Sequence, residues 1–406
     1  MSKGVLSYIK NWFVDMARVV RREFGLVFSS PGTMLFFFAL PLAYPIVYAA
    51  IYNPEVTRDM PVAVVDNCRT AESREFVRHA DATQAIKICG YAADKAEARR
   101  WWEEKKCYGV IEIPADYSKR TYRGEQGVIN FYSDMSLLLR YRTFLESLTS
   151  LQMATDADYR TMAINTLGLG EMGGGGSVET ESYFLGDPQQ GFASFIIPGI
   201  VVLILQQSML LGITFLGGAS KDRSRQHGGR DPLAIAASPL ATVIGKALCY
   251  VILYIPLCIY ILHYIPVWFS FPHIGDIFDA ILFMVPLLVA SAMLGQCLQV
   301  MVSERESAFI VVVFTSVAFL FMSGLTWPRY AMPDFWKVFS DMIPATWGVE
   351  GFIRINNNGA TLAQQTVPYL WLWGLSLGYF VIAYSITRFR DRAARLSVKK
   401  CEIKEG

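Results

Sequence analysis

The chain has 406 residues, of which 53% are hydrophobic, 14% aromatic and only 18% charged, and its formal net charge at pH 7 is +2. These fractions exclude a wholly soluble or disordered chain and indicate a membrane protein with a soluble part. The near-neutral net charge lacks the basic excess that is typical of nucleic-acid-binding proteins.

An amphipathic segment comes first, between Leu6 and Phe28. Its apolar residues recur at roughly helical spacing, with basic residues between them. This pattern predicts a helix that lies on the inner leaflet of a membrane. The sequence Ser29-Ser30-Pro31-Gly32 then breaks the helix, so we assign 1–33 as a cytoplasmic interface helix.

Six stretches without Asp, Glu, Lys or Arg are long enough to cross a membrane. We therefore predict an α-helical polytopic membrane protein with six transmembrane helices. The stretches are Met34–Tyr52, Phe192–Leu216, Ala247–Phe269, Ala280–Val302, Ala308–Trp327 and Val367–Thr387.

Lys and Arg residues are unevenly distributed between the connections. They are frequent before Met34, in the loop after the second span and in the tail at 389–406, whereas the loop Ser270–Asp279 has none. Because basic loops stay in the cytoplasm, both termini are predicted to be cytoplasmic and 53–190 to lie outside.

The segment 53–190 alternates strand and helix patterns, which predicts a small extracytoplasmic α/β domain. A long helix, Leu137–Leu167, and a flexible linker, Gly173–Ser177, are expected to follow. Asp66, Glu112 and Asp134 stand at strand ends, where capping and solvation explain them better than paired-carboxylate chemistry. The expected strands lie at 61–66, 85–89, 108–114 and 128–132, and the shorter helices at 72–79 and 94–105.

The glycines and cysteines of this segment give no cofactor site. Gly168-Leu169-Gly170 is not followed by the Gly-Lys-Ser/Thr of a phosphate loop. Cys68, Cys89 and Cys107 can form at most one disulfide among themselves, and no cysteine spacing resembles a metal site.

The five remaining spans and their connections occupy 191–388. Two connections in this region carry motifs. The first, 217–242, contains the cluster Lys221–Arg225, then Gly228-Gly229 and Pro232-Leu233. The second, 328–356, follows Ala308–Trp327. Between Pro333 and Glu350 it is apolar but too short and too interrupted to span, which predicts re-entrant or interfacial helices at one membrane face.

This second connection resembles the last third of ABC type-2 exporter permeases. The resemblance rests on the ordered residues Phe321, Ser323, Gly324, Pro328, Met332, Pro333, Ile343, Pro344, Glu350 and Gly351. The phrases Val62–Asp66, Tyr108–Pro114 and Phe131–Asp134 are similar to the external domain of the drug-export subgroup, which has a large external domain between its first two spans.

The resemblance implies positions for two functional regions. It implies a coupling helix, a short amphipathic helix that docks into an ATPase, although Arg230-Asp231 and an extra glycine pair replace the family's usual charge cluster. The ATPase-coupling residues are then Arg22, Glu23, Lys221, Asp222, Arg223, Arg225, Pro232 and Leu233. The exit-gate residues are Phe321, Ser323, Gly324, Pro328, Met332, Pro333, Pro344 and Glu350.

Polar side chains inside the spans are few, and four of them are Gln206, Gln207, Gln296 and Gln299. Polar groups at this depth are costly unless they are paired or face a cavity. These glutamines either line a central path or tie helices together.

The resemblance implies a permease subunit of an exporter in a bacterial inner membrane, which moves a hydrophobic or amphipathic substrate outward. It is not expected to be an enzyme or to bind a cofactor or metal, since ATP and Mg belong to a separate ATPase subunit. The other expected partners are a second permease, identical or paralogous, membrane lipid and a periplasmic adaptor, but no nucleic acid.

Two alternatives remain open at this point. One is a membrane-anchored signalling or mechanotransmitting protein whose external domain senses a ligand. The other is an intramembrane enzyme such as a lipid-modifying transferase. The enzyme requires a cluster of His, Asp or Glu at a membrane face, and the four histidines do not converge by spacing.

Overall fold

The computed structural model describes residues 2–52, 58–123, 125–133, 138–166, 191–229 and 231–405. The chain forms two compact units, Met1–Asn53 with Phe184–Gly406, and Pro54–Tyr183. We call them the helical unit and the inserted unit. The predicted linker Gly173–Ser177, the Gly168–Gly170 sequence and Asp134 lie outside the described residues.

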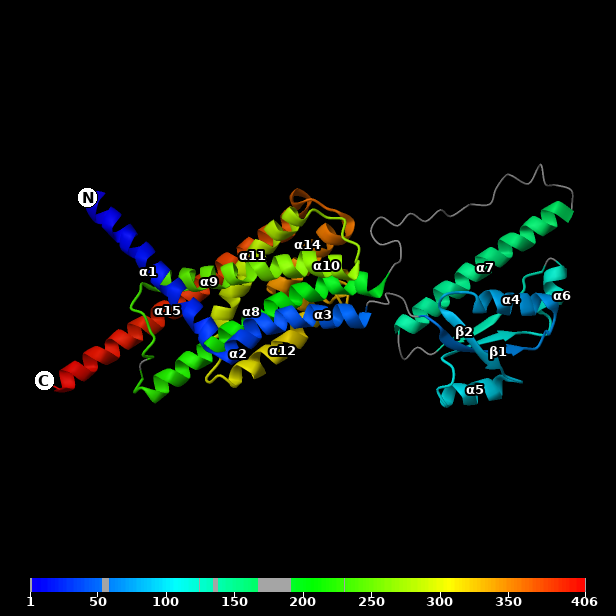
Figure 1. The fold of residues 1–406 in the computed structure, drawn as a ribbon, viewed down its shortest axis with the longest axis horizontal. Coiled ribbons are helices and arrows are strands. Elements are labelled where there is room, and N and C mark those ends of the chain that lie inside the picture. Colours follow the sequence, from blue (N-terminus) through cyan, green and yellow to red (C-terminus); the bar gives the residue numbers. More distant parts are fainter. Residues whose placement is uncertain are drawn as a thin grey trace. The chain divides into compact units, whose positions relative to one another are not determined.

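The helical unit is a bundle of long helices (Figure 1). Two five-residue π-helical turns, Leu35–Ala39 and Tyr260–Tyr264, join α2 to α3 and α9 to α10 without a break. Its α-helices are α1 (Ser2–Ser29), α2 (Pro31–Met34), α3 (Leu40–Tyr52), α8 (Phe192–Gln226), α9 (Pro239–Ile259), α10 (Ile265–Phe269), α11 (Ile277–Leu298), α12 (Ser307–Met322), α13 (Asp334–Asp341), α14 (Pro344–Asn358) and α15 (Thr366–Glu405).

Five helical stretches among the described residues are long and apolar enough to cross a membrane. This confirms a polytopic helical membrane protein. The stretches are Pro31–Tyr52, Phe192–Gln226, Pro239–Phe269, Ile277–Leu298 and Leu362–Arg392.

The predicted span Ala308–Trp327 differs from this pattern. Its helix, α12, has only 16 residues because Ser323 and Gly324 end it, with Gly324 in the left-handed region at φ +86°. The segment nevertheless follows α8 closely, since Gly218 borders the backbone of Arg305 and Gly199 borders the side chain of Leu325. Nineteen residues of α8 separate those two glycines, which is roughly 29 Å of helix.

The core of the helical unit lies where α8, α9, α11 and α14 meet. Glycines allow the close approaches. A Cβ atom at Gly212 would lie 2.2 Å from the Phe37 ring, and one at Gly351 would lie 2.2 Å from the Phe283 ring. α8, which supplies many of the buried residues, is therefore the central helix of the bundle.

The inserted unit is an α/β layer structure with a four-stranded sheet in the order β2-β1-β3-β4. β1 runs parallel to β2 and β3, and β4 pairs antiparallel with β3. The elements are β1 (Met60–Asp66), α4 (Ala71–Asp81), β2 (Ile86–Tyr91), α5 (Lys95–Glu103), β3 (Gly109–Ile113), α6 (Tyr117–Tyr122), β4 (Asn130–Ser133) and α7 (Leu138–Thr166).

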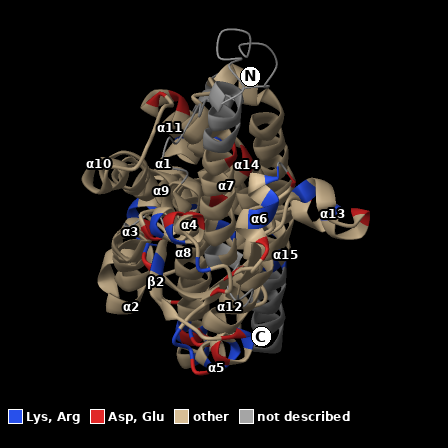
Figure 2. Ribbon diagram, turned by 90° about the vertical axis from the view of Figure 1, so that its right-hand side faces the viewer, with Lys and Arg blue, Asp and Glu red and all other residues tan. Residues whose placement is uncertain are grey.

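Both faces of this sheet are covered, which explains the uninterrupted apolar run in β1. Val62 and Val64 pack with residues of α4 and α7, whereas Ala63 and Val65 pack on the α5 side. Thr70 caps α4 through a capping box, and Asp94 accepts a hydrogen bond from the Glu97 amide at the start of α5. Figure 2 shows both signs of charge on α4 and α5.

Candidate functional site

The most connected group of buried charges lies at one end of the helical unit. We call this end the charged end; it comprises residues 18–23 of α1, residues 217–246 of α8, α9 and their connection, and residues 299–306 between α11 and α12. Asp231 is its centre. The Asp231 carboxylate accepts two hydrogen bonds from the Arg223 guanidinium at 3.0 Å each, one from Ser220 Oγ at 2.6 Å and one from the Leu233 amide at 3.0 Å.

Arg22 of α1 completes this cluster, because its Nη2 lies 3.5 Å from Asp231 Oδ2. The Asp231 side chain is only 7% exposed. Burial opposes its ionisation, but the hydrogen bonds from Arg223, Ser220 and the Leu233 amide outweigh burial and lower the pKa of Asp231 to about 2. The ionised carboxylate therefore joins α1 to the end of α8.

Glu23 ties α1 to α9 in the same way. Its side chain is 2% exposed and accepts a hydrogen bond of 2.8 Å from the Tyr250 hydroxyl. Lys246 Nζ lies 3.8 Å from its Oε1 atom. α1 also packs closely on α9, where a Cβ atom at Gly245 would lie 3.0 Å from Val19. The Glu23 carboxylate is therefore enclosed within the chain in this structure, and its role in ATPase coupling stays a prediction.

The predicted coupling residues at 221–225 do not form a separate short helix. They continue α8, which runs to Gln226, so the expected independent amphipathic helix is corrected to an extension of a long span. Lys221 Nζ donates to the backbone carbonyls of Gln299, Val300 and Val302 at the end of α11. It is thus engaged within the chain.

Asp222 and Arg225 also bind the connection between α11 and α12. Asp222 pairs with Arg305 at 3.7 Å, and Arg225 pairs with Glu304 at 2.7 Å. The Arg225 side chain is 59% exposed, whereas Arg223 is 18% exposed. Of the predicted coupling residues, Arg225, Pro232 and Leu233 are the exposed ones that remain available to a partner.

The predicted gate residues lie at the opposite end of α12, in residues 321–354, which we call the hairpin end. Ser323 is 1% exposed and donates to the Leu320 carbonyl at 2.8 Å. Ser340 of α13 donates to the Met322 carbonyl at 2.7 Å, which caps α12. Pro344 is buried, Met332 and Glu350 are half-buried, and Phe321, Pro328 and Pro333 are exposed.

Arg329, which was not among the predicted gate residues, organises the hairpin end. It binds Asp341 and lies 2.5 Å from Glu350 Oε2, and its guanidinium lies 4.2 Å above the Trp347 ring. Trp347 stacks in turn on Trp371 of α15 with the ring centroids 5.1 Å apart. The detectable signal was a single cation in a long uncharged stretch, with Asp341 and Glu350 downstream.

Of the carboxylates of the inserted unit that could suggest catalysis, Asp66 and Glu112 lie among the described residues, and both have partners in the protein. Asp66 accepts hydrogen bonds from the amides of Cys68 and Arg69 and from Ser73. Glu112 is bound by Lys95 at 2.9 Å, by Asn130 and by Tyr132. Burial opposes ionisation of Glu112, but these partners lower its pKa overall. Neither carboxylate is free to act as a base.

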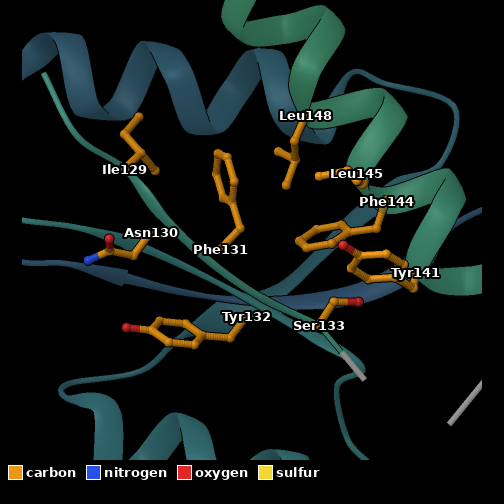
Figure 3. A pocket seen from close by; sticks show the side chains of 9 residues that line it. All are labelled: Ile129, Asn130, Phe131, Tyr132, Ser133, Tyr141, Phe144, Leu145 and Leu148. Carbon is orange, nitrogen blue, oxygen red and sulfur yellow. The ribbon is translucent and has the colours of Figure 1, made fainter. Parts of the chain in front are cut away.

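The inserted unit also has a cavity of about 330 Å³ between β4 and α7. Figure 3 shows the rings of Phe131 and Phe144 and the side chain of Leu148 gathered on one side of the sheet, with Tyr132 on the other. Its lining has no charged side chain.

The described residues contain neither a candidate metal site nor a disulfide bond. No group of three or more His, Cys, Asp or Glu side chains among them is arranged to hold a metal. Cys68, Cys89 and Cys107 are all free thiols, and burial raises the pKa of Cys107 to about 11.

Comparison with known proteins identifies the architecture. A family model described as ABC-2 family transporter protein matches residues 31–385, which include the hairpin end and all of the charged end except residues 18–23 of α1. No curated protein matches the chain. Members of such a family are membrane subunits of transporters without catalytic activity of their own. The chain therefore belongs to the ABC-2 transporter family, and it is a multi-pass membrane permease.

Proposed function

We propose that the chain is the permease subunit of an ABC exporter that moves a hydrophobic or amphipathic substrate out of the cytoplasm or the inner leaflet. ATP and Mg are bound by a separate ATPase subunit, and two permeases form the path. The charged end faces the cytoplasm of a bacterial cell and the inserted unit lies outside, where it caps the exit or meets an adaptor. The positive-inside distribution of Lys and Arg supports this orientation.

The observation that carries the proposal is the buried network around Asp231 and Glu23. Through these two carboxylates, α1, α8 and α9 are joined by charge-assisted hydrogen bonds at one end of the bundle. Lys221 extends the connection to the end of α11. A push on this end is therefore transmitted to several long helices together.

The exposed residues beside the network are the contact for the ATPase. Leu233 is 48% exposed, and it is held in place by the hydrogen bond from its amide to Asp231. An exposed apolar side chain on a fixed turn suits a docking cleft in a partner. Arg225 supplies an exposed positive charge nearby.

Purification of the permease in mild detergent from its native host tests the proposal. We expect a stoichiometric chain with a nucleotide-binding sequence to co-purify and to hydrolyse ATP. Leu233→Asp combined with Arg225→Glu should release that chain, while the bundle keeps its fold because Leu233 is exposed and the Arg225–Glu304 pair is more than half exposed on both sides. The matched control is Tyr330→Asp at the hairpin end, where the side chain is 88% exposed.

The results separate the alternatives. Loss of the ATPase in the charged-end variant and its retention in the Tyr330 variant support the exporter. A clean, folded permease without any ATPase, under conditions that keep known transporter complexes intact, contradicts the proposal and favours a sensing role.

A further inference from the structure

The structure separates the four glutamines of the spans into two kinds. Gln296 donates from Nε2 to the Val243 carbonyl of α9 at 3.3 Å, and Gln299 packs its side chain against Gly217 of α8. These two tie helices together. Gln206 and Gln207 differ, since neither the oxygen nor the nitrogen of either amide has a hydrogen-bond partner among the described residues, although all four atoms are shielded from solvent.

Gln206 lies on the face of α8 that contacts α11. Val202 of α8 and Leu287 of α11 both border Gly348 of α14, so they mark one level at which these three helices meet. Ile213 of α8 borders Gly295 of α11 and marks a second level. On α8, Gln206 lies between these two levels, one turn after Val202. It is therefore at the height of the middle of the α11 segment Leu287–Gly295.

Ser291 occupies that middle position on α11. It lies one turn after Leu287 and one turn before Gly295, on the same face. Ser291 is 0% exposed and Gln206 is 1% exposed. The Ser291 hydroxyl also has no hydrogen-bond partner in the described structure. Two enclosed and unpartnered polar side chains thus stand at one level of the α8–α11 contact.

Several other buried hydroxyls of the bundle do have partners, although that of Thr33 in α2 lacks one too among the described residues. Thr214 donates to the Leu210 carbonyl, Ser376 donates to the Leu372 carbonyl, and Ser208 donates to the Leu205 carbonyl while it accepts from Tyr254. Buried polar groups normally find a partner in this way. An amide and a hydroxyl left without partners therefore point to a ligand with hydrogen-bonding groups of its own.

Gln207 extends this polar level toward α12. Arg305 and Leu325 lie against Gly218 and Gly199, so the middle of α12 passes α8 at the height of Gln207. Leu211 lies one turn after Gln207 on the same side of α8. It belongs to a hydrophobic cluster that also contains Ala308 and Val312 of α12. Gln206 and Gln207 also lie near the midpoint of the uncharged stretch Phe192–Leu216.

We propose that Gln206, Gln207 and Ser291 form a mid-membrane site that hydrogen-bonds an uncharged polar group, such as a hydroxyl, carbonyl or amide, of an amphipathic substrate. The uncharged class follows from the surroundings, because the six uncharged stretches contain no Asp, Glu, Lys or Arg that would neutralise a charged group. This inference rests on the proposed function, since the site is filled when α8 separates from α11 and α12 during export.

Thermal stability of the purified permease tests whether the side chains are unpartnered at rest. Gln206→Leu and Ser291→Ala should leave Tm unchanged or raise it, because each removes buried polar atoms without breaking a hydrogen bond. The matched control is Gln296→Leu, which should lower Tm because it breaks the bond to Val243. A lower Tm in Gln206→Leu would assign that side chain to a helix tie and overturn the site. This test needs no ATPase, so it holds even if the proposed function fails.

Cysteine labelling of the complete transporter tests access and ligand class. Gln206→Cys and Ser291→Cys, each in a chain without its seven natural cysteines, should react with a methanethiosulfonate reagent during ATP turnover but not at rest. Leu205→Cys, at a fully buried apolar position on the same helix, is the control and should stay unreactive. Neutral hydroxyethyl methanethiosulfonate should react at least about tenfold faster than the cationic trimethylammonioethyl reagent, after correction for their rates with a free thiol.

The outcomes separate this site from the exporter proposal. If ATP is hydrolysed but both cysteines remain as unreactive as Leu205→Cys, the exporter stands and the site is refuted. If the cationic reagent reacts as fast as the neutral one, the position belongs to an open aqueous path, and the assignment to uncharged groups is refuted.

Discussion

The two ends of the helical unit are both held by ion pairs, but the pairs join very different parts of the chain. At the charged end, Glu23 and Tyr250 are 227 positions apart in the sequence, and the two central carboxylates are 2% and 7% exposed. At the hairpin end, Arg329 and Glu350 are 21 positions apart, and their side chains are 17% and 25% exposed. The first arrangement unites distant helices, whereas the second fixes one local turn.

This difference indicates separate mechanical roles. A network that joins α1, α8 and α9 passes a displacement to all three helices. The Arg329 cluster instead holds α13 and α14 against the end of α12, so it fixes the shape of one segment. Breaking each network should therefore have distinct consequences for stability and for coupling.

The largest effect is expected from Asp231→Asn. The substitution leaves the Arg223 guanidinium, which is 18% exposed, without its carboxylate, and Arg22 keeps only its pairing with Glu23 at 3.4 Å. Loss of one partner of a largely buried pair costs about 2 to 4 kcal/mol. Thermal unfolding in detergent measures the loss, and ATP hydrolysis by the complete transporter should uncouple from export at the same time. Normal stability together with normal coupling would show that the network does not join the helices.

Arg329→Gln should have the next largest effect on stability. It removes the ion pairs to Asp341 and Glu350 and the contact with Trp347, at an expected cost of about 1 to 3 kcal/mol. Because the cluster is local, binding of the ATPase should be unchanged. Dissociation of the ATPase from this variant would contradict the separation of the two ends.

Acid should weaken the charged end in a defined pH range. The pKa of Asp231 is lowered from its ordinary value of 3.8 to about 2, so its contribution to stability is fully present above about pH 4 and is lost as the pH falls toward 2. That contribution is roughly 2 kcal/mol. Stability of the wild-type permease should fall over this range more steeply than that of Asp231→Asn. Parallel curves would mean that the carboxylate is not stabilised in the folded state.

Tyr250→Phe tests a single hydrogen bond of the charged end. The variant removes the hydroxyl that donates to Glu23 at 2.8 Å but keeps the ring, so packing is unchanged. The expected cost is about 1.5 kcal/mol, as for a hydrogen bond to a charged group. A double substitution with Glu23→Gln should cost less than the sum of the two single changes. Additive costs would show that the two side chains do not interact.

The smallest effect on stability is expected from Arg225→Ala. Its ion pair with Glu304 is more than half exposed on both sides, and such pairs contribute less than about 1 kcal/mol. The Tm should stay close to that of the wild type, while the affinity for the ATPase falls. A large drop in Tm would mean that Arg225 holds the fold rather than a partner.

Much of the architecture follows from the sequence because its signals are local. Uncharged length predicts five of the helices, and the alternation of strands and helices predicts the order of the inserted unit. The length of α12 was not predictable from the absence of charge alone, because Ser323 and Gly324 end the helix although neither residue is charged.

The candidate site was less predictable for a physical reason. Which side of α1 Glu23 faces depends on where α9 packs, and Tyr250 is too distant in sequence to reveal it. Similarly, four glutamines looked alike in the sequence, but only the packing distinguishes Gln296, bonded to Val243, from Gln206, which has no partner among the described residues.

The most direct test of the account is a pair of distances in the complete transporter with and without ATP. Spin labels at the exposed positions Arg18 and Gln226 report within the charged end, and labels at Gln226 and Tyr330 report between the two ends. We predict that the first distance stays constant while the second changes when ATP binds, because α1, α8 and α9 move as one body. A change between Arg18 and Gln226, or a constant distance between Gln226 and Tyr330, would contradict this prediction.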